Sequence, residues 1–252
     1  ASALRRILRA APPKAPKPIA EILNARYDQS DDADAETPAL REALLEALAA
    51  TALPSASDRM TQSLKDPAGV VRLAALNGLR QLQTKTAAKA IAPLVADSDR
   101  GVRLAAVGAL AQLAGMDYFK TIFQRTKPAV EEDAEVRKAA RDALMGLFRE
   151  ADATTLTEGI KLLDTDRETL PLRIELLRLY VKRQRTAKAE SLPADLRRLG
   201  MALGESGEHA QSAATLLEGY KLLQATAKTA DQQFTLQALW GDCATAALNA
   251  SD

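Results

Sequence analysis

The composition of this 252-residue chain excludes several classes of protein. Hydrophobic residues make up 47% of it and aromatic residues only 4%, so the core must consist largely of Ala, Leu and Val, which favours closely packed helices. The 34 Lys and Arg nearly balance the 33 Asp and Glu, so net charge directs the chain neither to nucleic acid nor to an acidic surface. One cysteine, Cys243, and one histidine, His209, exclude an internal disulfide and the common structural zinc sites. The sequence has no apolar run long enough for a membrane span, so we expect a soluble chain.

Residues 1–18 are predicted to form an N-terminal arm or linker. A short basic amphipathic stretch, ALRRILRAA, precedes PPKAPKP at 12–18, where the density of prolines favours an extended chain. Because the sequence begins with Ala1 and not with Met, we expect a processed or excised segment of a larger protein. Helical patterns at 19–27 and 38–52, joined by an acidic loop, predict a first helix pair.

The central part of the chain repeats one pattern. The segment DPAGVVRLAALNGL at 66–79 returns as DSDRGVRLAAVGAL at 97–110, with an arginine in the same place 31 residues later. Five copies can be anchored in this way, on Arg41, Arg72, Arg103, Arg137 and Arg173. The middle three are strong matches, whereas the first and last depend as much on spacing as on identity.

Each copy encodes two helices joined by a turn. The apolar residues of 71–79 recur at i, i+3, i+4, i+7 and i+8, which places one apolar stripe along a helix. Asp, Pro and Gly at 65–69 and 97–101 end the preceding helix and start this one. Apolar segments at 59–64 and 87–95 predict the shorter first helices. One helix pair cannot cover its own apolar face, so the pairs must stack.

The pattern of turn acid, Val-Arg, Ala-Ala and Leu resembles the HEAT repeat, in the short form of roughly 30 residues found in many bacterial proteins and in phycobilisome lyases. The resemblance covers about residues 38–182 and implies an all-α fold, a right-handed α-solenoid of stacked antiparallel helix pairs. It also implies that turn acids and second-helix arginines form a structural ladder between adjacent repeats. The expected ladder residues are Asp66, Arg72, Asp97, Arg103, Asp133, Arg137 and Arg173. In the third copy Glu131, Glu132 and Asp133 crowd the turn, so the partner acid there stays open.

The arginine-anchored pattern stops near residue 190, and residues 191–252 are predicted to form a helical extension. Small residues around Gly200, Gly207 and Ala213 give it a weak likeness to a tetratricopeptide repeat. A second copy beginning near Gly241 would be 41 residues further on, which is wrong for the 34 residues usual in that family. The predicted organisation is therefore the arm at 1–18, about five helix pairs at 19–190, and the extension at 191–252.

Two features are candidate interaction surfaces. The basic run Arg178, Lys182, Arg183 and Arg185 could bind an anionic partner, although such a run is more often a solvated helix end, where cations are favourable. Trp240 could anchor a partner, although a lone Trp near a chain end more often fills the core between the last helices. The ladder arginines could also form a stripe that binds phosphates, but their pairing with the turn acids is the more common arrangement.

The sequence contains no catalytic motif that we can assign. It has no GxSxG, no P-loop and no GxGxxG, and a Cys243–His209 pair would lack any residue to orient it. We expect no cofactor, no metal site and an exposed His209 at a helix start. The aromatic residues Tyr118, Phe119 and Phe123 are predicted to be core residues of a first helix.

These observations favour a non-catalytic protein–protein interaction scaffold, with a protein partner or client whose identity stays open. One alternative is a nucleic-acid-binding HEAT-like module, like the glycosylases that act on alkylated bases, but such a module would need a strongly basic face, so nucleic acid is not expected as a partner. Another is an accessory module to an enzyme or to a protein that handles a prosthetic group. The compartment, cytoplasmic or periplasmic, and the oligomeric state stay open.

Overall fold

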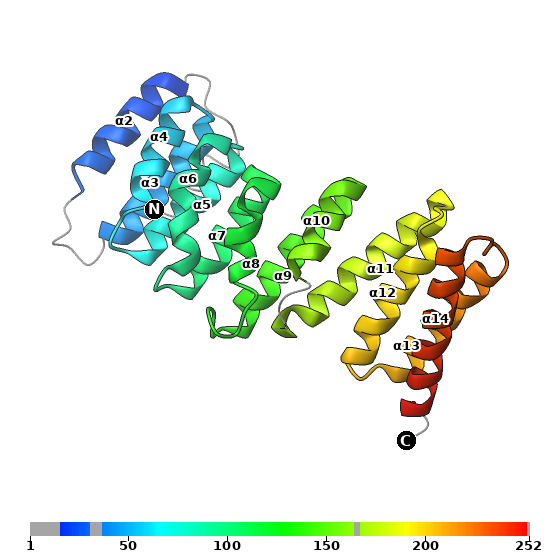
Figure 1. The fold of residues 1–252 in the computed structure, drawn as a ribbon. Helices are drawn as coiled ribbons and strands as arrows, with labels where there is room; N and C mark the ends of the chain where they lie inside the picture. Colours follow the sequence, from blue (N-terminus) through cyan, green and yellow to red (C-terminus); the bar gives the residue numbers. More distant parts are fainter. Residues whose placement is uncertain (1–15, 31–36, 164–166, 251–252) are drawn as a thin grey trace. The chain divides into compact units, whose positions relative to one another are not determined.

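The computed structural model describes residues 16–30, 37–163 and 167–250, and within these ranges it contains helices and no strand (Figure 1). The expected all-α fold of stacked helix pairs is confirmed. The chain forms two compact units, which divide between Leu147 and Phe148. This division falls inside helix α9 (Ala134–Glu150) and not near residue 190, where the arginine-anchored pattern ends.

The first unit consists of helix pairs (Figure 1). The first helices are α2 (Pro16–Asp28), α4 (Pro54–Ser63), α6 (Ala88–Ile91) and α8 (Phe119–Gln124). The second helices are α3 (Thr37–Thr51), α5 (Gly69–Gln81), α7 (Arg100–Ala114) and α9. Helix α3 packs against α5 and α5 against α7, so these three second helices lie side by side.

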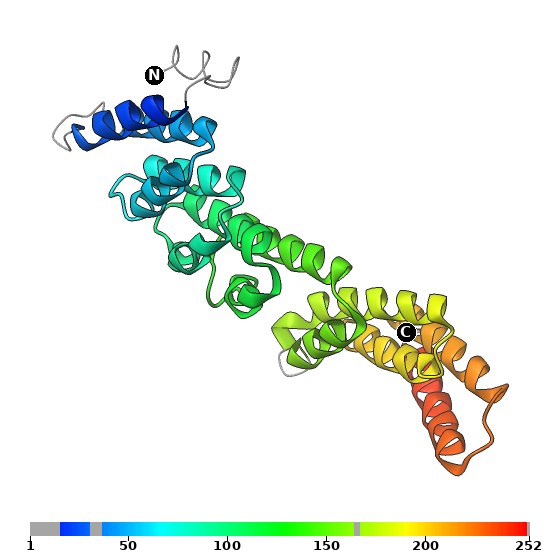
Figure 2. The ribbon, with the colours of Figure 1, turned by 90° about the horizontal axis from the view of Figure 1, so that it is seen from above.

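In the second unit each helix packs against the next one along the chain (Figure 2). The helices are α10 (Ala153–Leu163), α11 (Leu170–Ala187), α12 (Leu192–Glu205), α13 (His209–Gln224) and α14 (Ala230–Asn249). The helices α12 and α13 cross closely at Gly200, where an added Cβ would lie 2.5 Å from Cγ of Leu216. The likeness to a tetratricopeptide repeat stays a prediction.

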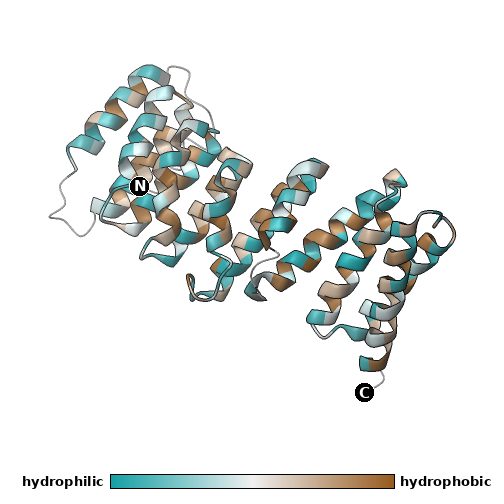
Figure 3. Cartoon of the chain, in the orientation of Figure 1, coloured by the Kyte–Doolittle hydropathy of each residue, from teal (hydrophilic) through white to brown (hydrophobic). Residues whose placement is uncertain are grey.

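The core of the repeats is the apolar stripe expected from the sequence. In each of three successive second helices a Val, an Ala and a Leu are fully buried, while polar residues lie on the outside (Figure 3). These residues are Val71, Ala75 and Leu79 in α5, Val102, Ala106 and Leu110 in α7, and Val136, Ala140 and Leu144 in α9. Burial of each Leu or Val contributes about 1.5–3 kcal/mol, and the small Ala between them lets neighbouring helices approach.

Two local expectations are wrong. The segment 12–18 is not extended throughout, because α2 begins at Pro16; proline is tolerated in a first helical turn, where the backbone N–H groups have no helical partner. Residues 1–15, with the predicted basic stretch, lie outside the described ranges. The segment 87–95 is not one α-helix: α6 has only four residues and gives way to a 3₁₀ turn at Ala92–Ala96, because Pro93 cannot donate to the helix.

Candidate interaction surfaces

A repeated arginine fork joins one repeat to the next. In α5, Arg72 donates from Nε and Nη2 to the two carboxylate oxygens of Asp97, at 2.8 and 2.6 Å. Its Nη1 donates to the carbonyl oxygens of Asp66 and Pro67, at 2.7 and 2.9 Å. One planar guanidinium therefore ties the turn of its own repeat to the turn of the following repeat, a geometry that a lysine cannot reproduce.

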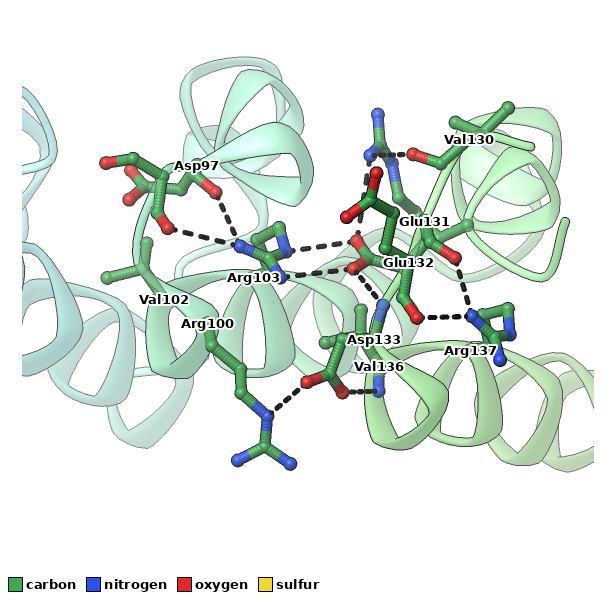
Figure 4. Close-up of polar contacts among 12 residues, drawn as sticks. Asp97, Arg100, Val102, Arg103, Val130, Glu131, Glu132, Asp133, Val136 and Arg137 are labelled. Atoms are coloured by element: carbon green, nitrogen blue, oxygen red, sulfur yellow. Dashed lines mark hydrogen bonds and ion pairs between the residues drawn. The ribbon is translucent and has the colours of Figure 1, made fainter. Parts of the chain in front are cut away.

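The same arrangement recurs on both sides of this pair. Arg103 in α7 donates from Nε and Nη2 to Glu131, at 3.0 and 3.1 Å, and from Nη1 to the carbonyl oxygens of Asp97 and Ser98 (Figure 4). Arg41 in α3 pairs with Asp66, with Nη2 3.1 Å from Oδ1 and Nε 3.0 Å from Oδ2. Both acids are buried, so these pairs are shielded from solvent screening.

The structure corrects the expected place of Asp133 in this ladder. The ladder acid lies six residues before the arginine of its own repeat, at Asp66, Asp97 and Glu131. Asp133 lies four residues before Arg137 and caps α9, accepting from the backbone N–H of Val136 at 3.0 Å, while it also accepts from Arg100 (Figure 4). Asp99 caps α7 from the same position. Glu131 is found by counting six residues back from Arg137. Counting 25 residues forward from Arg103, as from Arg41 to Asp66 and from Arg72 to Asp97, misses it, because the segment between arginine and acid is three residues longer here.

The last members of the series differ. Arg137 donates from Nη1 to the carbonyl oxygens of Glu131 and Glu132, at 2.8 and 2.7 Å, and the turn that follows α10 includes residues 164–166, outside the described part. Arg173, the fourth residue of α11, pairs with Glu205 at the end of α12. The fourth residue of α13 is Ser212, whose hydroxyl donates to the carbonyl oxygen of Gly200 at 2.7 Å. The series of arginines therefore ends before α13.

The acid of the Arg72 pair makes stability depend on pH. Burial alone would raise the pKa of Asp97, but hydrogen bonds from Arg72 and from the backbone N–H of Asp99 outweigh it and hold this pKa below its ordinary value. A carboxyl with a lowered pKa in the folded state contributes stability above its unfolded pKa, about 3.9, and loses that contribution as the pH falls through its folded pKa.

We therefore expect Asp97→Asn to lower the free energy of unfolding by about 2 kcal/mol near pH 7 and by much less at a pH below the folded pKa of Asp97, where both proteins lack the charge. Urea unfolding of both proteins at the two pH values measures this difference. An unchanged difference at low pH would show that the carboxylate charge is not what stabilises the joint.

The basic run of α11 is largely engaged within its own unit. Arg178 donates to Glu208 and Gln211 of α13, at 3.0 and 2.9 Å, and Arg185 pairs with Glu218. Arg183 donates to the carbonyl oxygens at the end of α9, those of Phe148, Arg149 and Ala151, which have no partner within the helix. Lys182 is exposed. Three of the four cations thus have structural partners, which weakens this run as an anion site.

Trp240 lies on the surface of α14, with 58% of its accessible area exposed. Its ring centroid is 5.4 Å from that of Tyr220 in α13, in a tilted arrangement. The core position next to it belongs to Leu239, which is fully buried. The expectation that this tryptophan fills the core is therefore wrong, whereas its role as an interaction anchor stays a prediction.

The remaining candidate residues do not form a catalytic arrangement. The thiol of Cys243 is directed to the carbonyl oxygen of Ala213 at 3.7 Å and not to an imidazole, and His209 is half-buried at the start of α13. Burial raises the pKa of Asp195, whose carboxylate accepts from Gln184. Phe119 and Phe123 are core residues, stacked at 5.7 Å. In the described part of the chain no cluster of His, Cys, Asp and Glu could hold a metal ion, and no helix is both long and apolar enough to cross a membrane.

Surface depressions in the first unit are open and not enclosed. One of about 600 Å³ lies between α2 and α4 and is lined by residues that include Glu21, Asn24 and Asp28. Asp28 is paired with Arg59 at 2.7 Å, and Asn24 accepts from the same guanidinium. These polar groups therefore have structural roles.

Comparison with known families agrees with the repeat geometry. A family model described as HEAT repeats matches residues 31–111 and, in a second overlapping placement, residues 57–145. No match was found among curated proteins. The matched region spans the arginine forks of α3, α5 and α7.

Proposed function

We propose that the chain is a non-catalytic protein–protein interaction scaffold, because residues 31–145 match a family model of HEAT repeats and arrays of such repeats generally bind other proteins. Function in such an array depends on the surface that the repeats present and not on a single pocket. The finer question is which surface of the first unit takes the client.

The observation that carries this proposal is that different residues of the second helices make the joints and the exposed surface. The repeated charges are used in the joints. Of positions one, five and nine after each joint arginine, position five differs in all three repeats, and positions one and nine are shared by α5 and α7 but change in α9. We call these positions the second-helix ridge: Leu73, Asn77 and Gln81 in α5; Leu104, Gly108 and Gln112 in α7; Lys138, Asp142 and Gly146 in α9. All are exposed or half-buried, and this spacing places each set of three on one face of its helix.

The ridge is continuous from α5 to α7. Arg80 of α5 donates to the side-chain oxygen of Gln112 at 3.0 Å, and its guanidinium lies 3.8 Å from where a Cβ of Gly108 would be. Half-buried Leu73 and Leu104 lie at the start of the ridge, with amides beyond them. This combination of apolar contact and uncharged hydrogen-bonding groups suits a peptide segment of a client protein and offers no cluster of cations to a phosphate backbone.

The test is capture of client proteins from the source organism by the full chain and by two charge-matched variants. We expect Asn77→Arg with Gln81→Arg, on the ridge, to lose the captured client. Gln62→Arg with Gln124→Arg places the same two charges on exposed positions of the first helices α4 and α8 and should keep it. Circular dichroism of both variants checks that they stay folded.

Two results would contradict the proposal. Loss of the client in the first-helix variant alone would assign binding to the opposite surface. A chain that captures no protein but turns over a small substrate would show that it is an enzyme.

A further inference from the structure

Helix α14 has the composition of an interior helix but an exposed position. Charged residues make up 27% of the chain, yet among the 20 residues of α14 only Asp231 and Asp242 are charged. Helix α7, inside the first unit, is similarly poor in charge and buries six of its 15 residues, whereas α14 buries only Leu239 and Ala246. An interior composition without burial indicates that another surface covers α14.

Five exposed residues of α14 follow a heptad pattern. Phe234, Gln237, Gly241, Ala244 and Leu248 are spaced by three and four residues in alternation, which places them in one row along the helix. We call this row the α14 seam. Phe234 and Leu248, at its ends, are 74% and 71% exposed, and Trp240 flanks its centre. A seam of this spacing is the pattern with which one helix packs along another.

The centre of the seam is a glycine with no role inside the chain. A Cβ on Gly241 would meet no atom within 4 Å, so neither packing nor backbone conformation requires glycine there. Glycine inside a helix costs about 1 kcal/mol relative to alanine, so this position lacks an explanation within the chain. Close approach of a second backbone at the centre of the seam supplies one.

We propose that two copies of this chain dimerise by packing their α14 seams against each other in antiparallel fashion. Gly241 is midway between Phe234 and Leu248, so in such a pair the two glycines face each other at the two-fold axis. Phe234 of each copy then lies beside Leu248 of the other, and the large ends fill the space that the small centre leaves open.

Charge favours a second copy as the occupant. A two-fold interface brings like residues near one another, so a charged face would repel itself; the seam carries no charge, and Asp242 on the flank is bound by Arg197 at 2.6 Å.

The end of the arginine series argues against a further repeat of the same array at this place. In the preceding repeats the fourth or fifth residue of the second helix is an arginine, and Arg41, Arg72 and Arg103 each pair with an acid in the turn of the following repeat. In α13 that residue is Ser212, which bonds back to Gly200. The joint that would receive a following repeat is therefore missing. The α14 seam and the second-helix ridge consist of different residues, so the dimer and the scaffold function are tested independently.

The experiment measures the mass of the full chain by sedimentation equilibrium from about 1 to about 100 µM, together with the emission of Trp240. Because Trp240 is the only tryptophan and flanks the seam, we expect its emission to shift to the blue as the dimer forms. Phe234→Glu with Leu248→Glu should weaken dimerisation at least about 100-fold and abolish the shift. Ile22→Glu, at a position of α2 that is 68% exposed, is the matched control and should dimerise normally.

A second variant separates close packing from unspecific apolar association. Gly241→Leu adds apolar surface at the centre of the seam, so it should strengthen an unspecific contact but weaken a dimer that needs close backbones. A monomer throughout the concentration range, a dimer that survives the double Glu variant, or a tighter dimer with Gly241→Leu would overturn the proposal.

Discussion

Replacing Arg103 with alanine is expected to lower the free energy of unfolding by about 3 kcal/mol or more. The substitution removes both hydrogen bonds to Glu131 and leaves a carboxylate that is only 2% exposed without its main cation. Arg125 compensates only in part, because its Nη1 forms a longer ion pair with the Glu131 carboxylate, at 3.8 Å. The two bonds to the carbonyl oxygens of Asp97 and Ser98 are lost as well. Urea unfolding followed by circular dichroism measures the change.

Two companion variants identify the cause. Arg103→Lys keeps the charge but not the planar fork, so we expect it to recover only part of the loss. Arg100→Ala removes an arginine three residues away whose pair with Asp133 is exposed, 53% on the arginine side, and we expect a much smaller effect. Equal losses for Arg100→Ala and Arg103→Ala would show that burial of the pair does not matter. A stable Arg103→Ala protein that no longer captured its client would instead place this arginine in the binding surface.

Replacing Gly200 with valine is expected to cost about 3 kcal/mol through steric overlap. At the crossing of α12 and α13 an added Cβ would lie 2.5 Å from Cγ and 2.7 Å from Cδ2 of Leu216, which is itself buried. Glycine and valine differ by less than about 0.5 kcal/mol in helix propensity, so the change reports packing and not backbone preference. The measurement is the shift of the urea midpoint at constant slope.

Gly146→Val in α9 is the matched control. It makes the same substitution inside a helix where an added Cβ would meet no atom within 4 Å. We expect a change within about 0.5 kcal/mol, since only helix propensity is altered. A large loss at both positions would indicate that valine disrupts these helices by itself, and the close crossing at Gly200 would then not be the cause.

The sequence predicted the repeat unit and its core because both depend on local spacing. The stripe from Val71 to Leu79 follows from the 3.6-residue period of a helix, and its burial follows from the need of each pair to cover an apolar face. The turns before α5 and α7 followed from Asp, Pro and Gly, whose backbone preferences act within a few residues. The helix pair α2 and α3 was predicted in the same way. The start of α2 at Pro16 was not predicted, because proline ends a helix in its interior but is tolerated in its first turn.

The tertiary structure decided the partners of the charged and aromatic side chains. Glu131 accepts the Arg103 fork while Asp133, two residues later, caps α9, because the longer loop sets which carboxylate reaches the guanidinium. Arg183 donates to a carbonyl oxygen at the end of α9, more than 30 residues away in the sequence. The basic run of α11, which the sequence presents as free positive charge, therefore has partners within the chain.

The sequence by itself thus determined the all-α repeat architecture, the apolar stripe and the series of arginines, since periodicity and turn preferences act over a few residues. Only the tertiary structure decided which acid pairs with which arginine and that Trp240 is exposed while Leu239 is buried. It alone also showed that a Cβ on Gly241 would have no atom within 4 Å. These outcomes depend on distances between segments about 20 to 35 residues apart in the sequence, which are set by loop lengths and helix crossing and leave no periodic trace in the chain.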